Sequence, residues 1–158
     1  MPERNVAPGR LGGLALASVV ACSNVAASAT TVELTDLAWE RRVILIFTGP
    51  AEPVDASLEQ ALKRYACHIR DRDLNIYSVG QGSVTPLTPA ATPIDDGAAS
   101  LRGIYASSEG GRELVLIGKD GGIKARGRSL EALPTFFGLI DGMPMRRAEQ
   151  RSRGLECG

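Results

Sequence analysis

Val43-Ile44-Leu45-Ile46-Phe47 is an unbroken apolar run that ends at Thr48-Gly49-Pro50. The run is short and rich in β-branched residues, which is typical of a strand that is buried on both faces of its sheet. Such a strand needs helices on both sides of the sheet to cover it. We therefore expect this run to be the central strand of an α/β domain.

An amphipathic helix is expected directly after this strand. Asp55 is suited to cap the helix, because its carboxylate can accept a hydrogen bond from the first turn. A further strand is expected at 74–79, so the segment predicts a right-handed β-α-β unit with parallel strands. The apolar residues of the helix recur at helical spacing and comprise Leu58, Ala61, Leu62, Tyr65, Ala66 and Ile69.

The chain from Gly80 to Ser100 contains three prolines among small polar residues and is expected to form a mobile surface loop. The loop is expected to end in a short helix that carries Leu101, Ile104 and Tyr105. Asp95 or Asp96 would cap this helix, although the pair could also form a weak cation site.

A β-hairpin and a final helix complete the expected fold. Residues 113–117 and 123–126 would pair around an Asp120-Gly121-Gly122 turn, which explains the glycines better than a phosphate-binding loop does. Ser129 would cap the last helix, with Pro134 in its first turn and Pro144 at its end. Its expected apolar face comprises Leu130, Leu133, Phe136, Phe137, Ile140 and Met143.

Residues 1–29 are interpreted as an export signal. Arg4 and Arg10 precede a stretch without charges, and Ala27-Ser28-Ala29 suits cleavage before Thr30. Val19-Val20-Ala21-Cys22 resembles a lipobox, so an alternative product is lipidated at Cys22 and anchored to a membrane. We favour a soluble periplasmic or secreted product over the outer-membrane lipoprotein. No other segment is apolar enough to span a membrane.

The expected mature chain comprises a domain at 30–148 and a flexible tail at 149–158, with Arg146, Arg147, Arg151 and Arg153 as a solvated basic end. The whole chain has 18 basic and 18 acidic residues. The signal holds two of the basic residues and one of the acidic residues, so the mature part is close to neutral. Such a charge gives no field that would attract nucleic acid, and it leaves the partners unidentified.

Four segments resemble domain-of-unknown-function family 4174 over about residues 34–148. They are Asp36-Leu37-Ala38-Trp39-Glu40, Arg72-Asp73-Leu74, Leu114–Lys124 with its Gly-Lys-Asp-Gly-Gly sequence, and Met143-Pro144-Met145-Arg146-Arg147. The resemblance implies a peroxiredoxin-like or thioredoxin-like fold, and the expected order β-α-β-(α)-β-β-α agrees with it. We therefore expect a mixed sheet of about four strands, with a parallel β-α-β half and a C-terminal hairpin. The resemblance implies no established activity.

The position of the usual nucleophile in this fold lacks a cysteine. Thioredoxin-like enzymes place a reactive thiol after the first strand, at a helix N-terminus that favours the thiolate. Here Thr48 and Ala51 occupy the first and last positions of the Thr-x-x-Cys pattern of peroxiredoxins. The cis-proline that usually faces this site is also missing, since no proline lies just before Glu113. We interpret Thr48 and Ala51 as a vestigial nucleophile loop and expect no thiol catalysis from it.

Two cysteines remain in the mature chain. Cys67 lies opposite the apolar face of its helix and is expected to be exposed, near Lys63, Arg64 and Arg70. Our hypothesis is a Cys67–Cys157 disulfide, and two unpaired thiols are the alternative. His68 is the only histidine, and without a cluster of ligands no metal or other cofactor is expected.

These observations favour an exported, non-catalytic binding or accessory module. Fold alone does not give function. An atypical thiol-redox enzyme that uses Cys67 is the first alternative, and an envelope component anchored through Cys22 is the second.

Overall fold

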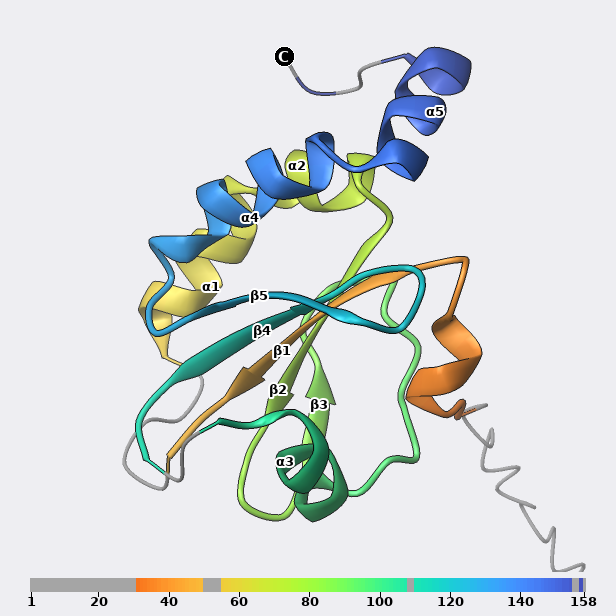
Figure 1. Ribbon diagram of the computed structural model, residues 1–158. Coiled ribbons are helices and arrows are strands. Elements are labelled where there is room, and N and C mark those ends of the chain that lie inside the picture. Colours follow the sequence, from red (N-terminus) through yellow and green to blue (C-terminus); the bar gives the residue numbers. More distant parts are fainter. Residues whose placement is uncertain (1–30, 50–54, 108–109, 155–156, 158) are drawn as a thin grey trace, which may run out of the picture.

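The computed structural model describes residues 31–49, 55–107, 110–154 and 157. Its centre is a five-stranded mixed sheet in the order β3-β2-β1-β4-β5 (Figure 1). The strands are β1 (Arg42–Phe47), β2 (Leu74–Val79), β3 (Val84–Pro86), β4 (Glu113–Ile117) and β5 (Ile123–Gly127). The apolar run expected as the central strand is β1, which pairs parallel to β2 and antiparallel to β4.

Helices cover both faces of the sheet, which explains the unbroken burial of β1. The helices are η1 (Leu34–Leu37), α1 (Ala56–Arg64), α2 (Ala66–Asp71), α3 (Ala98–Tyr105), α4 (Ala132–Asp141) and α5 (Pro144–Arg153). Ile44 and Ile46 of β1 belong to a core with residues of α1, α2 and α4. Val43, Leu45 and Phe47 point to the opposite face and belong to a core with η1 and α3. Figure 1 shows these two layers on either side of the sheet.

The β-α-β unit and the C-terminal hairpin are confirmed, and the fold is the expected thioredoxin-like one. The hairpin turns at Gly121, whose φ of 77° lies in the left-handed region that glycine adopts without strain. The sheet has one strand more than expected, because Val84–Pro86 pairs antiparallel with β2.

The segment from Gly80 to Ser100 is packed against the sheet, so the expectation of a mobile surface loop is wrong. Beyond β3, the Leu87 N–H donates to the Ile76 carbonyl, and the Ile76 N–H donates to the Thr88 hydroxyl. Further along, Ala91 and Ile94 are buried in the core beside α3. These hydrogen bonds and the buried side chains of Ala91 and Ile94 hold the segment against the sheet.

Asp95 and Asp96 do not cap α3, which begins after Gly97 without a side-chain cap. Asp95 instead accepts a hydrogen bond from the Thr31 hydroxyl, and Asp96 accepts one from the Leu34 N–H. The two carboxylates tie the start of the domain to the segment before α3, and this contact could not be read from local sequence.

Several helix boundaries also differ from expectation. The first amphipathic helix is broken at Tyr65 into α1 and α2, while Asp55 caps α1 as expected. The residue before α4 is Glu131 rather than Ser129, and Pro134 lies in its first turn. Pro144 begins a separate helix, α5, which continues to Arg153 where a flexible tail was expected from residue 149.

Candidate functional site

The carboxyl end of the sheet, where β1 and β2 finish, is the place where this fold usually carries a nucleophile. Thr48 is buried there, and its N–H donates to the Val79 carbonyl. Ala51 lies outside the described residues. Thr48 therefore continues the sheet, and its backbone is already engaged.

The guanidinium of Arg102, from α3, closes this end of the sheet. Its Nη2 atom donates to the carbonyl oxygens of Thr48 at 2.6 Å and Val79 at 2.7 Å, and Gly80 also accepts from it. The same group lies 5.5 Å from the centre of the Phe47 ring. A cation in this place satisfies the carbonyls at the strand ends, which would otherwise need water.

The N-terminus of α1, where a thiolate would be stabilised, is capped by the carboxylate of Asp55 instead. Asp55 accepts from the Leu58 N–H at 2.9 Å and from the Ser57 hydroxyl at 2.6 Å. Arg112, the residue before β4, donates to the other oxygen of Asp55 at 3.0 Å. The hydrogen bond from Ser57 is the largest cause that lowers the pKa of Asp55, followed by those from Leu58 and Arg112. Among the described residues, this end of the sheet presents no thiol.

The two cysteines of the domain lie at the other end of the molecule. Cys67 of α2 and Cys157, beyond α5, form a disulfide with their Cα atoms 6.0 Å apart. Cys67 is half-buried rather than exposed, because this bond covers it. Nη2 of Arg70 lies 3.7 Å from the Cys67 sulfur. Cys22, the lipidation candidate, lies outside the described residues.

The amino end of the sheet, where β1 and β2 begin, is built around buried charges. Arg146 of α5 is 1% exposed and pairs with the side chain and carbonyl of Asp71. Arg42 is equally buried and donates two hydrogen bonds to Glu149 of α5. Arg146 was expected in a solvated basic end, and its burial corrects that expectation.

Two further cations complete this ion network. Lys119 follows β4 and pairs with Asp73 at 2.9 Å and with Glu149 at 2.7 Å. Arg72 pairs with Asp141 at 2.6 Å and lies 5.2 Å from the Phe137 ring centre. We call this set the ion network; it comprises Arg42, Arg72, Lys119 and Arg146 with Asp71, Asp73, Asp141 and Glu149. Each of these four cations has a carboxylate partner within the set, as burial of charge requires, and the more exposed Arg153 also pairs with Asp73 at 3.0 Å.

The ion network lowers the pKa values of Asp73 and Glu149. Burial raises the pKa of Asp73, but hydrogen bonds from Arg153 and Lys119 outweigh it and hold that pKa below its ordinary value. Glu149 shows the same balance, with burial opposed by Arg42 and Lys119, and its pKa is also lowered. Both groups therefore favour the charged form in the folded protein.

His68 and the Gly-Lys-Asp-Gly-Gly sequence, the two other candidates from the sequence, both have structural roles. His68 stacks on Phe137 with ring centres 5.7 Å apart, and Nη1 of Arg72 lies 3.4 Å from its Nδ1 atom. The Gly-Lys-Asp-Gly-Gly sequence forms the turn between β4 and β5, and its Lys119 pairs with carboxylates of the ion network. No group of three or more metal-ligating side chains occurs within residues 31–49, 55–107, 110–154 and 157.

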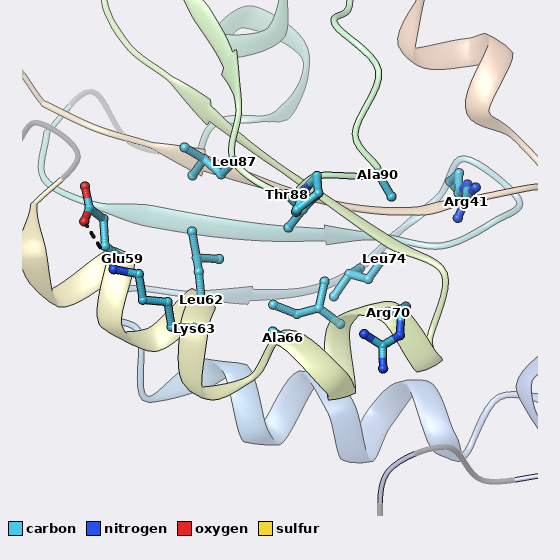
Figure 2. Close-up of a pocket in the computed structure, with 12 residues that line it drawn as sticks. Arg41, Glu59, Leu62, Lys63, Ala66, Arg70, Leu74, Leu87, Thr88 and Ala90 are labelled. Atoms are coloured by element: carbon cyan, nitrogen blue, oxygen red, sulfur yellow. Dashed lines mark ion pairs between the residues drawn. The ribbon is translucent and has the colours of Figure 1, made fainter.

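A groove of about 490 Å³ lies between the α1–α2 pair and the segment that follows β3 (Figure 2). We call it the α1–α2 groove. Its apolar wall comprises Leu62, Ala66, Ile69, Leu74, Leu87, Pro89 and Ala90. Ala66 was expected on the buried face of a single helix, but the structure exposes it. The groove exists because α1 and α2 cover this part of the sheet face incompletely and the small side chains of Ala66 and Ala90 leave space between them.

Charged side chains lie at the two ends of the α1–α2 groove. Figure 2 shows Arg41 and Arg70 at the end where Leu74 lies, and the ion pair of Glu59 and Lys63 at the opposite end. Glu59 and Lys63 are 4.0 Å apart and largely exposed. The volume falls in the range of small-molecule sites, about 300–1,000 Å³. Periodicity alone could not reveal the groove, because it depends on the break at Tyr65.

The model of a family described as domain of unknown function (DUF4174) matches residues 33–149. Two solved structures from Plasmodium yoelii are similar over 78% of this chain: thioredoxin peroxidase I, with 17% identity, a TM-score of 0.49 and 82% of its chain covered, and Prx1a modified at the N-terminus, with 15% identity, a TM-score of 0.46 and 83% covered. No curated protein matches the sequence. None of the described helices is long and apolar enough to cross a membrane.

Proposed function

The chain belongs to the domain-of-unknown-function family 4174, and from this premise we propose that it is an exported, non-catalytic module that binds a small apolar ligand in the α1–α2 groove. The observation that carries the proposal is the groove itself, an apolar concavity with charges only at its ends. Ligand sites of small molecules have this composition, with a mostly apolar wall and a few polar groups that orient the ligand.

The carboxyl end of the sheet supports the non-catalytic part of the proposal. Catalysis by a thiol requires a thiolate near a helix N-terminus or a cation. At this end Asp55 caps α1, and Arg102 and Arg112 are engaged with carbonyls and with Asp55. A carboxylate and engaged guanidinium groups provide no nucleophile that resembles a thiol.

Two observations support export. The segment at 1–29 has the pattern of a signal, and Cys67 and Cys157 form a disulfide. Disulfides persist in oxidising compartments such as the periplasm. Mass spectrometry of the mature protein tests this part: an N-terminus at Thr30 supports a soluble product, whereas a lipidated Cys22 would replace it with an anchored one. Titration of the unreduced protein should detect no free thiol in the domain.

Binding in the groove is tested with Nile red, an uncharged apolar dye. We expect saturable binding to the mature protein, weakened about tenfold or more by Ala66→Phe, because the ring fills the space beside Leu62 and Leu74. Ala148→Phe is the matched control, since Ala148 is an exposed alanine of α5 away from the groove. Equal binding by the two variants would contradict the proposal.

Catalysis is tested separately. Peroxide consumption with a thiol reductant and insulin reduction should both stay at the rate of the reagents alone, in wild type and in Cys67→Ser. Turnover that depends on Cys67 would favour the thiol-redox alternative.

A further inference from the structure

We propose that the surface around Trp39 is a docking site for a partner protein that presents a basic peptide segment with one large apolar side chain. The apolar side chain would enter a pocket beside η1, and the basic residues would face the carboxylates around it. The pocket is lined by residues of the core on the η1 and α3 face of the sheet, whereas the α1–α2 groove lies on the other face. The inference therefore goes beyond the proposed function and does not depend on it.

Trp39 is exposed in a backbone conformation that a bulky residue rarely adopts. It is the only tryptophan, and it is 67% exposed. Its φ of 68° lies in the left-handed region, which is strained for any residue with a bulky side chain. The backbone N–H of Trp39 donates to the Lys119 carbonyl, which holds the residue against the β4–β5 turn (Figure 1). Backbone strain gathers at functional surfaces, and tryptophan is enriched among residues that carry binding energy at interfaces.

A pocket of about 220 Å³ lies between η1, the end of α3 and the β4–β5 turn. We call it the η1 pocket. Trp39 lies at its rim, because the preceding Ala38 and the nearby Gly118 both line the pocket. Its volume is below the range of small-molecule sites, about 300–1,000 Å³, so it suits one anchoring side chain better than a whole ligand. Its apolar lining comprises Leu34, Leu37, Val43, Tyr105 and Ile117.

Five carboxylates without a basic partner lie on and beside η1. In the described part of the chain, no basic side chain forms an ion pair with any of them. Asp96 accepts a hydrogen bond from the Leu34 N–H, and Leu34 lines the pocket. Burial raises the pKa of Tyr105, and the charge of Asp96 raises it further, so this carboxylate also lies near a second lining residue. The five carboxylates are those of Glu33, Asp36, Glu40, Asp95 and Asp96.

The cations near the η1 pocket do not cancel these carboxylates. Lys124 pairs with Asp120 at 2.6 Å, so that pair is neutral. Arg126 pairs with Glu113 at 2.8 Å in the same way. Arg41 is the one other charged residue in the lining of the pocket. The surface around Trp39 is therefore negative, which attracts and orients a basic partner.

A peptide in which basic residues flank an apolar one matches both features of this surface. An uncharged apolar molecule would leave the carboxylates unused, and an inorganic cation would leave Trp39 and the pocket unused. In an extended peptide, one side chain can enter the pocket while its neighbours point to the rim. Basic side chains would keep much of their hydration there, since the three carboxylates on and next to η1 are exposed.

The experiment uses the emission of Trp39 in the mature protein, which reports on this site alone because the chain has one tryptophan. The probe is the synthetic peptide acetyl-Gly-Lys-Arg-Phe-Lys-Arg-Gly-amide. We expect it to shift the emission to shorter wavelength and to protect Trp39 from quenching by acrylamide, with saturation. The peptide with Ala in place of Phe should bind about tenfold more weakly, and added salt should weaken both. The peptide with Glu in place of every basic residue should have no effect.

Variants are compared by the fluorescence anisotropy of the Phe peptide labelled with fluorescein. Trp39→Ala should weaken binding about tenfold or more, whereas Leu139→Ala, at an exposed apolar residue of α4 on the other face, should leave it unchanged. Asp36→Asn/Glu40→Gln should weaken it about threefold or more. Glu131→Gln, at an exposed carboxylate before α4, is the matched control and should have no effect.

The remaining outcomes identify other occupants and separate the two sites. Equal responses to the Phe and Ala peptides, or equal binding by Trp39→Ala and Leu139→Ala, would overturn the docking site. A shift of the Trp39 emission when the protein alone is concentrated would assign the surface to a second copy of the chain and contradict the proposal. Trp39→Tyr, which keeps an aromatic ring, should retain most of the binding. Ala66→Phe should bind the peptide like the wild type, so failure of Nile red binding and failure of peptide binding are seen independently.

Discussion

The two ends of the sheet are stabilised by different kinds of interaction. At the carboxyl end, Arg102 closes the strands through their carbonyl oxygens, and Asp55 caps α1. At the amino end, the ion network joins four pairs of opposite charge among the strand ends, α2, α4 and α5. The groove also lies toward the amino end, because Arg41 and Leu74 line it just before β1 and at the start of β2.

This difference shows at which end of the sheet the residues of the family-specific segments lie. The segments on which the family resemblance rests meet at the amino end. The backbone N–H of Trp39 donates to the Lys119 carbonyl, and Arg72, Asp73 and Arg146 belong to the ion network. Thioredoxin-like enzymes work at the carboxyl end. The distinctive residues of this chain instead fix the architecture next to the groove.

The largest expected loss of stability comes from a substitution that breaks the ion network. Arg146→Met should lower the free energy of unfolding by about 3–5 kcal/mol, because the buried Asp71 would lose its closest partner and keep only Arg72 at 3.6 Å. Arg147→Met, at the exposed neighbouring position of the same helix, should change it by less than about 0.5 kcal/mol. Denaturant unfolding of both variants measures the difference. An equally small loss of unfolding free energy in the two variants would show that apolar contacts alone hold α5 on the domain.

The second effect concerns the disulfide that joins α2 to the chain beyond α5. Cys157→Ser should lower the free energy of unfolding by about 2–4 kcal/mol, because the bond restricts a long loop in the unfolded chain. Reduction of the wild type should give the same loss. If unfolding of the wild type is insensitive to reductant, the bond is not part of the stable amino end.

The third effect is at the carboxyl end. Arg102→Met should lower the free energy of unfolding by about 1.5–3 kcal/mol, since the carbonyls of Thr48 and Val79 lose a charged donor. Arg128→Met is the control, because Arg128 is exposed between β5 and α4. Equal stability of the two variants would mean that water replaces the guanidinium without cost.

The smallest effect is a dependence on pH. The folded pKa of Glu149 is lowered from its ordinary value of 4.5, so its stabilising contribution is complete above pH 4.5 and is lost as pH falls through the folded pKa. Unfolding measured from pH 6 downward should show stability that decreases with acidity. Glu149→Gln should flatten the slope by up to one proton. An unchanged slope would assign the acid sensitivity to Asp73, Asp55 and Glu113, whose pKa values are also lowered.

Local pattern was sufficient for the main strands and helices, but it missed β3, the separate helix α5 and the site. The apolar run of β1, the hairpin at Gly121 and the buried face of α4 follow from periodicity and turn chemistry, and the structure contains all three. The break at Tyr65, which exposes Ala66 to the groove, depends on packing against distant residues. The ion network was also missed, because Arg146 and Glu149 read as solvated charges until β1 and β4 bring Arg42 and Lys119 beside them.

One measurement tests the central claim, that the protein acts by binding in the α1–α2 groove rather than by chemistry at the carboxyl end. Amide chemical shifts of the mature protein are recorded while Nile red is added. The account predicts that the changes concentrate at residues 59–74 and 87–90 and around Arg41. Changes centred instead on Thr48, Asp55 and Arg112, with the groove unaffected, would contradict it.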